Sequence, residues 1–343
     1  MRAIPAVDSV SLAIQRTREF LFRPFTWGTF LKLGLVAMIT EGIGSNSNSF
    51  SKHDHPAGHG PVIRSLSEIP VEWIAAAAAA VLLAIVLSLF VFYLITRLRF
   101  AYFNCLAHNI KEIGPGWRLY GSQALRFFGL NLVAGFAFLL LVVGIALPFV
   151  AGFMRLFHEY RQGLQLNVGL MLSLVLPLIP VLLLLVVLGI VTDLVLRDFM
   201  LPHFALEDAT AGEAWAQVWT RITVEKSQFF VYALLRVVLP GIAMIGIFFV
   251  LAIPGIALAG AFAAIFYGIH SAFAGATGGA MVAGILVQAF FGVVAFGFFL
   301  LLSICLGGPV ATATREYALT FYGGRYQALG NALYPPPPPQ LTV

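Results

Sequence analysis

Hydrophobic residues in this chain gather into long runs that short polar segments separate. A helix needs about 20 apolar residues to cross the roughly 30 Å hydrocarbon core of a bilayer, and lipid tolerates only backbone whose polar groups pair internally. Six runs reach that length and predict six transmembrane helices. They cover residues 25–44, 71–95, 127–153, 168–196, 229–252 and 280–306. The pattern therefore predicts an all-α integral membrane protein.

A seventh apolar stretch, residues 255–269, follows Pro254 and is too short to cross comfortably. Three interpretations remain open for it. It is a kinked extension of the preceding helix, a segment that lies in the membrane interface, or a re-entrant piece.

Amphipathic segments precede the first, third and fifth runs. The clearest one has the i, i+3, i+4, i+7 spacing of one helix face: Trp215, Val218, Trp219 and Ile222. Thr210 and Glu213 form a capping box that starts this helix. The spacing recurs in two further sets, Trp117, Tyr120, Ala124 and Phe127, and less regularly Val7, Val10, Ile14 and Leu21. Helices of this kind lie in the headgroup plane, where Trp117, Trp215 and Trp219 are predicted to act as interfacial anchors.

These patterns predict three repeated units of interfacial helix, span, outer loop and span. An arginine leaves the membrane after each even-numbered run, at Arg99, Arg197 and Arg315. The units cover approximately residues 1–100, 101–200 and 201–320 of a single membrane domain, residues 1–330, which a proline-rich tail, residues 331–343, follows. The alternative is that basic cytoplasmic ends and aromatic belts create this likeness in any polytopic protein.

Composition and charge narrow the class and orient the chain. Only 10% of the residues are charged and the mean hydropathy is +0.94, which excludes a soluble enzyme, a disordered chain and a disulfide scaffold. The net charge of +5 does not indicate a nucleic-acid partner, because its distribution follows the membrane. Sixteen of the 20 lysines and arginines fall on one side, which places both termini in the cytoplasm.

Polar residues interrupt the beginning of each odd-numbered run, at Lys32, Asn131 and Arg236. Asp193 is the acid nearest to them, and it lies four residues before Arg197, in the favourable order for a helical pair. Polar groups inside a span are costly and mark function by default. Around a common axis these four residues would suit an anionic headgroup or a solute. The alternative is that Lys32 and Arg236 snorkel to the interface while Asp193 pairs with Arg197.

Three histidines, His53, His55 and His59, lie in the first outer loop. Imidazoles bind zinc, copper or nickel, so the loop is a candidate site for a divalent transition metal. Its serine, asparagine and glycine content predicts no rigid second shell, and therefore weak binding. No other cofactor is expected. No nucleotide loop, His-Glu-x-x-His helix or Gly-x-Ser-x-Gly elbow occurs, so no catalytic residue is assigned and an enzyme is disfavoured.

The exit from the fourth run reads Leu196-Arg197-Asp198 and continues through Pro202 to Ala205-Leu206-Glu207. With the paired runs and interfacial helices, this pattern resembles a group of uncharacterised bacterial six-span membrane proteins. It is similar to the membrane domain of glycerophosphodiester phosphodiesterases, over most of residues 1–330. The resemblance implies a multi-pass protein of the bacterial inner membrane that is concerned with lipids or the envelope.

We therefore expect a non-enzymatic membrane protein that binds or organises lipids, anionic ones among them, or a membrane-protein partner. The alternative is a small-solute transporter or channel whose path Lys32, Asn131, Asp193 and Arg236 would line. The orientation of Lys32, Arg236 and Gln288 separates the two hypotheses. Side chains that face a polar cavity favour transport, and side chains that face headgroups favour lipid contact.

Overall fold

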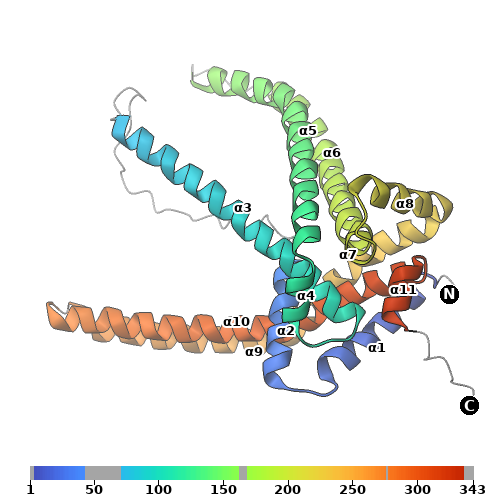
Figure 1. Ribbon diagram of the computed structural model, residues 1–343. Coiled ribbons are helices and arrows are strands. Elements are labelled where there is room, and N and C mark those ends of the chain that lie inside the picture. Colours follow the sequence, from blue (N-terminus) through green and yellow to red (C-terminus); the bar gives the residue numbers. More distant parts are fainter. Residues whose placement is uncertain (1–3, 43–70, 162–167, 276, 336–343) are drawn as a thin grey trace, which may run out of the picture. The chain divides into compact units, whose positions relative to one another are not determined.

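The computed structural model describes residues 4–42, 71–161, 168–275 and 277–335 of the 343. The elements in these ranges are helices, without a strand, so the all-α prediction is confirmed for them (Figure 1). In chain order they are α1 (Asp8–Phe22), α2 (Trp27–Ala37), the π-helix η1 (Met38–Gly42), α3 (Val71–Ala107), α4 (Ile113–Leu119), α5 (Gly121–Arg161), α6 (Val168–Leu194), the π-helix η3 (Val195–Met200), α7 (Leu201–Leu206), α8 (Ala211–Val224), α9 (Lys226–Ala272), α10 (Gly279–Gly323) and α11 (Gln327–Leu333).

Five helical segments in the described ranges are long and apolar enough to cross a membrane. They are Trp73–Ala107, Gly121–Glu159, Met171–Leu206, Lys226–Ala272 and Gly279–Gly323. Their large aliphatic and aromatic side chains are widely exposed, as expected for surfaces that lipid covers. The length and composition of these helices identify the chain as a multi-pass membrane protein.

The first of the six predicted spans is not among these five. Its described part is α2 of 11 residues and η1 of 5 residues, which together extend about 24 Å and fall short of a roughly 30 Å core. The apolar run from residue 25 includes Glu41, and this acid is buried in η1, where it forms ion pairs with arginines of the same unit. The prediction of a membrane-crossing helix over residues 25–44 is not confirmed, since residues 43 and 44 lie outside the described residues.

Residues 255–269 belong to α9, which runs without a break from Lys226 to Ala272 through Pro240 and Pro254. The interpretation as an extension therefore holds, and no separate re-entrant or interfacial piece forms. With 47 residues α9 is about 70 Å long, more than twice the hydrocarbon thickness. One part of this helix must therefore extend beyond the hydrocarbon core.

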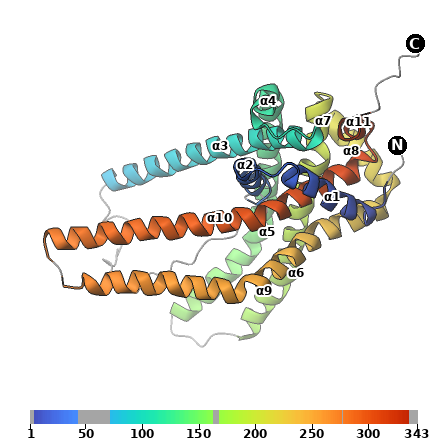
Figure 2. The ribbon, with the colours of Figure 1, turned by 90° about the horizontal axis from the view of Figure 1, so that it is seen from below.

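The chain divides into two compact units, and their boundaries differ from those of the predicted repeats. The first unit comprises Met1–Ile43, Asn104–Glu112 and Thr220–Val343, and the second comprises Gly44–Phe103 and Ile113–Trp219. Within the first unit α9 and α10 lie side by side as a long hairpin, and α2 runs across α10 rather than along it (Figures 1 and 2). The threefold repeat stays a prediction.

The crossing of α2 and α10 is close because both helices have a glycine at the contact. A Cβ atom on Gly308 would lie 2.7 Å from the Cα atom of Gly34, which is closer than side chains approach backbone. Nearby, Gly307 faces the flexible Met38 side chain. The glycines therefore let two backbones touch in this part of the first unit.

Helix α1 lies against the end of α10. Its buried residues are Ser9, Ala13, Thr17, Phe20 and Leu21. Val7 and Ile14, which the periodicity placed on the apolar face of an interfacial helix, are 63% and 59% exposed. Small side chains allow α1 to approach α10 closely, and the larger apolar ones then point away from the protein. Only Leu21 of the predicted face is buried.

In the second unit the predicted helical face from Trp117 to Phe127 is interrupted. Helix α4 ends at Leu119 and α5 begins at Gly121, so Tyr120 forms a corner. The rings of Tyr120 and Phe127 lie 5.8 Å and 5.5 Å from that of Phe100, and Phe204 of α7 packs 5.4 Å from Phe127. Burial raises the pKa of Tyr120. These residues form an aromatic core instead of a surface.

The predicted capping box of α8 is confirmed. The Thr210 N–H donates to Glu213 Oε2 at 2.9 Å, and the Glu213 N–H donates to Thr210 Oγ1 at 3.4 Å. Bonds from the backbone and side chain of Thr210 lower the pKa of Glu213, so the ionised form is favoured in the fold. A lowered carboxyl pKa stabilises above the unfolded value and ceases to do so as the pH falls through the folded value.

We therefore expect Glu213→Gln to lower the thermal unfolding temperature slightly at pH 7, because glutamine can keep the capping bond but not the charge. The difference from the wild type should disappear as the pH falls below the lowered carboxyl pKa. Thermal scans from pH 7 to pH 3 measure this. A difference that persists at the acidic end would show that the charge is not responsible.

Candidate functional site

Charged side chains are buried together in the first unit, at the end of the α9–α10 hairpin against which α1 and α11 lie. We call the set Arg16, Glu41, Arg236, Arg315 and Glu316 the charged core. Arg315 is 2% exposed, Glu316 1%, Glu41 7% and Arg236 9%. Charges are rarely buried unless they are paired, so their partners define what this region can do.

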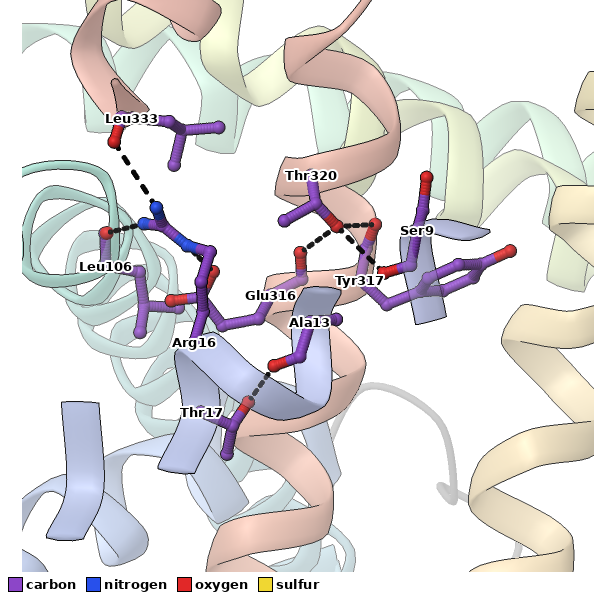
Figure 3. A network of polar contacts seen from close by, with 9 residues as sticks. All are labelled: Ser9, Ala13, Arg16, Thr17, Leu106, Glu316, Tyr317, Thr320 and Leu333. Atoms are coloured by element: carbon purple, nitrogen blue, oxygen red, sulfur yellow. Dashed lines mark hydrogen bonds and ion pairs between the residues drawn. The ribbon is translucent and has the colours of Figure 1, made fainter. Parts of the chain in front are cut away.

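Arg16 of α1 connects segments that are far apart in the sequence (Figure 3). Its Nε donates to Glu316 Oε2 at 2.9 Å, its Nη2 to the Leu106 carbonyl at 3.1 Å and its Nη1 to the Leu333 carbonyl at 3.3 Å. Thr320 Oγ1 also donates to the Ser9 carbonyl at 3.4 Å. This guanidinium therefore joins α1 to α10, α11 and the last turn of α3.

Arginines from two different helices form ion pairs with Glu41. Arg236 Nη2 of α9 lies 2.8 Å from Oε2, and Arg315 Nε of α10 lies 4.0 Å from Oε1. The carboxylate stands in η1, and π-helical turns often occur at functional positions. Arg236 is therefore paired within the protein.

Aromatic rings form a wall of the charged core. Tyr232, one turn before Arg236 on α9, stacks on Tyr317 with 5.0 Å between ring centroids and on Phe321 with 4.4 Å. The Tyr317 hydroxyl is buried and has no hydrogen-bond partner among the residues that the structure describes. A buried donor without a partner in the described part of the chain therefore lies in this wall.

A further ion pair, between Arg325 and Glu225, lies close to Ile4, the first described residue. The Arg325 Nη2 atom is 2.7 Å from Glu225 Oε2, its Nη1 donates to the Ile4 carbonyl at 2.9 Å, and its guanidinium lies 4.0 Å from the centre of the Phe321 ring. The Arg325–Glu225 pair thus fastens the N-terminal segment to the ends of both hairpin helices.

The charged core lies at one end of the charge-free part of the hairpin. No aspartate, glutamate, lysine or arginine occurs between Arg236 and Arg315. Each helix therefore has a charge-free stretch that is long enough for the hydrocarbon core, and each stretch ends at one of these two arginines.

The four residues of the predicted site are not brought together within one unit. Lys32 is exposed on α2, whereas Arg236 is buried against Glu41. In the second unit the Asn131 amide donates to the Phe127 carbonyl at 2.7 Å, and Asp193 lies 3.5 Å from Arg197. The pairing of Asp193 with Arg197 is as predicted, and both Asn131 and Asp193 have local partners.

The three arginines predicted to leave the membrane are all buried. Arg99 is 6% exposed and Arg197 5%, much as Arg315 is. Arg197 and the neighbouring Asp198, which is 1% exposed, lie in the second π-helix, η3. Sequence reasoning recognised the recurrence of these arginines but interpreted it as an interfacial feature. The signal that could have corrected it is the acid that follows Arg197 and Arg315 directly.

The turn between α1 and α2 carries four aromatic rings, Phe22, Phe25, Trp27 and Phe30, which we call the aromatic corner. Ring centroids of Trp27 and Phe25 are 5.2 Å apart, and those of Phe22 and Phe30 are 5.6 Å apart. Trp27 is 62% exposed, and Phe22 and Phe25 are more than 40% exposed. Rings that cluster yet stay exposed suit a membrane interface.

Basic residues are close to the aromatic corner, in the sequence or by direct contact. Arg23 and Lys32 are exposed, and Lys111 donates to the carbonyls of Arg23 and Pro24 at 3.0 Å each. Burial lowers the pKa of Lys111. The corner is therefore braced from the end of α3 and flanked by cations, which sequence reasoning did not identify because its residues straddle a predicted span boundary.

The predicted anchor tryptophans differ in their surroundings. Trp215 and Trp219 are 49% and 54% exposed on α8 and stack on each other at 5.8 Å, while Ala214 and Val218 are buried. Trp117 is half-buried, and Arg97 lies 4.7 Å from its ring centre. Trp117 thus packs on its own protein, and the pair on α8 presents aromatic surface outward.

The remaining predicted ligands do not form a site in the described part of the chain. His53, His55 and His59 lie outside the described residues, and no group of three metal-ligating side chains occurs among the residues that are described.

Gln288 Nε2 lies 3.2 Å from His270 Nδ1, next to a groove of about 550 Å³ between α9 and α10 whose walls are mostly aromatic or small residues. Gln288 therefore does not face a polar cavity.

Comparison with known proteins assigns a family. Residues 4–332 match a family of unknown function (DUF7544), and the chain belongs to this family. No curated protein and no solved structure matches the chain.

Proposed function

We propose that this member of the family is a non-enzymatic protein of the bacterial inner membrane that binds or organises lipids, preferentially anionic ones. The observation that supports this proposal is the aromatic corner with its flanking cations, Arg23 and Lys32. Exposed aromatic rings partition into the headgroup region, and nearby basic side chains attract anionic lipid. The exposed tryptophan pair on α8 provides a second interfacial contact.

The proposed orientation has both termini in the cytoplasm. The Arg325 bond to the Ile4 carbonyl favours it, because it holds the first and last described segments together. Lysine and arginine on that side agree with the positive-inside rule. The likeness to the membrane domain of glycerophosphodiester phosphodiesterases stays a prediction and would connect the protein with the same class of lipids. A membrane-protein partner on the exposed helices is compatible with this function.

Solute transport is the less favoured alternative. A transport path would need Lys32, Asn131, Asp193 and Arg236 to face a common polar cavity. Instead Arg236 is bound to Glu41, and the groove beside Gln288 is largely apolar. A groove of this kind suits an acyl chain better than a hydrated solute.

The double variant Arg23→Gln/Lys32→Gln tests the lipid proposal. Each basic side chain near an anionic surface contributes about 1 kcal/mol, so losing two is expected to reduce the preference for anionic over neutral lipid about ten-fold or more. Native mass spectrometry of co-purified lipid, together with binding to vesicles of phosphatidylcholine with and without phosphatidylglycerol, measures this preference.

The matched control is Arg155→Gln/Arg161→Gln, which removes the same charge from two exposed residues near the end of α5. It should leave the lipid preference at the wild-type value. If both double variants lose anionic lipid equally, net charge and not the aromatic corner is responsible, and the proposed site is wrong.

A further inference from the structure

Glu41 is the member of the charged core whose arrangement most resembles a bound ligand. Its two carboxylate oxygens face Arg236 at 2.8 Å and Arg315 at 4.0 Å, from two separate helices. Guanidinium groups that converge in this way bind carboxylate and phosphate oxygens. We propose that Arg236 and Arg315 form a binding site for a phosphate-class anion, which Glu41 occupies in the structure and which an incoming anion takes over.

The element that carries Glu41 is suited to withdraw. Glu41 lies in η1, beside Gly42, which is exposed and whose Cβ position has no atom within 4 Å. A π-turn contains one residue more than the α-helical register. Its conversion to α-helix turns the following residue by about 100°, which takes the carboxylate away from the arginines. Arg236 and Arg315 stay in place, because they belong to the long hairpin.

The aromatic wall of the charged core contains an additional hydrogen-bond donor, which suits a phosphate better than a carboxylate. Tyr232 and Arg236 are one turn apart on α9 and face the same side, and Tyr232 stacks on Tyr317. The Tyr317 hydroxyl is buried and has no hydrogen-bond partner among the described residues. A phosphate has more acceptor oxygens than a carboxylate, so this donor favours the larger anion.

Two sources of phosphate can supply this site. Arg236 and Arg315 delimit the charge-free part of the hairpin, a position compatible with the headgroup level. A lipid phosphate reaches this level from the membrane, and free phosphate reaches it from the aqueous side. Both present the same oxygen atoms to the guanidinium groups. The site is separate from the aromatic corner, so it does not depend on the function proposed above.

The test is the affinity of the purified full-length chain for inorganic phosphate, measured by titration calorimetry at constant ionic strength. If Glu41 occupies the site about nine-tenths of the time, it weakens the apparent affinity about ten-fold. Glu41→Gln should therefore bind phosphate about ten-fold more tightly than the wild type. The matched control is Glu225→Gln, which removes a carboxylate from the neighbouring pair with Arg325 and should keep the wild-type affinity.

Equal phosphate affinity of Glu41→Gln and the wild type overturns the proposal, as does tight binding that survives addition of Arg236→Gln. If Glu41→Gln does not fold, Glu41→Asp replaces it, because the shorter carboxylate reaches the arginines less well. This variant should also bind more tightly than the wild type, and equal affinity again overturns the proposal.

The source of the phosphate is determined in nanodiscs. In a phosphate-free galactolipid the Glu41→Gln variant should bind inorganic phosphate as it does in detergent. If added phosphatidylglycerol abolishes this binding, the site takes a lipid headgroup, and if binding is unchanged, it takes free phosphate. Arg23→Gln/Lys32→Gln should leave phosphate binding intact in either case, so failure of the lipid proposal and failure of this one are distinguishable.

Discussion

Replacing Arg16 by methionine is expected to lower the free energy of unfolding by about 3–5 kcal/mol, as removal of one partner from a buried ion pair does. Arg16 Nε bonds to Glu316, which is 1% exposed and would be left as a buried, weakly compensated carboxylate. Burial by itself lowers the pKa of Arg16, but the neighbouring Glu316 and Tyr334 together more than offset this and raise it. The Arg16 guanidinium therefore keeps its charge. Methionine retains most of the volume, so the loss is electrostatic.

The control for this prediction is Arg18→Met, on the same helix at an exposed position, which should change the stability by no more than about 0.5 kcal/mol. Adding Glu316→Gln to Arg16→Met should recover part of the loss, because the buried charge is then gone. Denaturant unfolding in detergent micelles, followed by tryptophan fluorescence, gives all three values. Equal stabilities of the two single methionine variants would contradict the role assigned to Arg16.

Contacts between residues close in the chain could be predicted from the sequence. The Asp193–Arg197 pair follows from a spacing of four residues, and the Thr210–Glu213 bonds follow from a spacing of three. The exposure of Trp215 and Trp219 follows from the amphipathic pattern of their helix. In each case one turn of helix determines the outcome, and the spacing is visible in the sequence.

The charged core could not be predicted, because its partners are far apart in the chain. Glu41 meets Arg236, which lies 195 positions away, and Arg16 meets Glu316, which lies 300 positions away. In the sequence, Glu41 interrupts an apolar run near its end. A lone acid there is costly in lipid and needs a cation, so the need for a partner was visible while its identity was not.

The buried face of α1 could not be predicted from its apolar pattern. Periodicity assigned Val7 and Ile14 to the apolar face of a helix in the headgroup plane, and both are exposed. Against α10 the buried positions include Ser9 and Ala13, since small residues bring the two helices close together. In a membrane protein lipid accepts the large apolar side chains, so helix contacts favour small ones.

Gly308→Leu is expected to destabilise the first unit by about 1–3 kcal/mol, the range for overpacking a close contact. The new Cβ atom would lie 2.7 Å from the Gly34 Cα atom, and a backbone atom cannot rotate away as a side chain can. Helix α2 must therefore move off α10. Since α2 continues into η1, the displacement also moves Glu41 relative to Arg315 and weakens an ion pair that lies two turns from the substitution.

The matched control is Gly297→Leu, on the same helix, where a Cβ atom meets nothing within 4 Å. This change should be neutral or slightly stabilising, because leucine favours helix more than glycine does. The midpoint of denaturant unfolding compares the two variants, and the phosphate affinity of Gly308→Leu should rise above the wild-type value if Glu41 is displaced. Equal midpoints for both variants would mean that α2 does not depend on its glycine contact with α10.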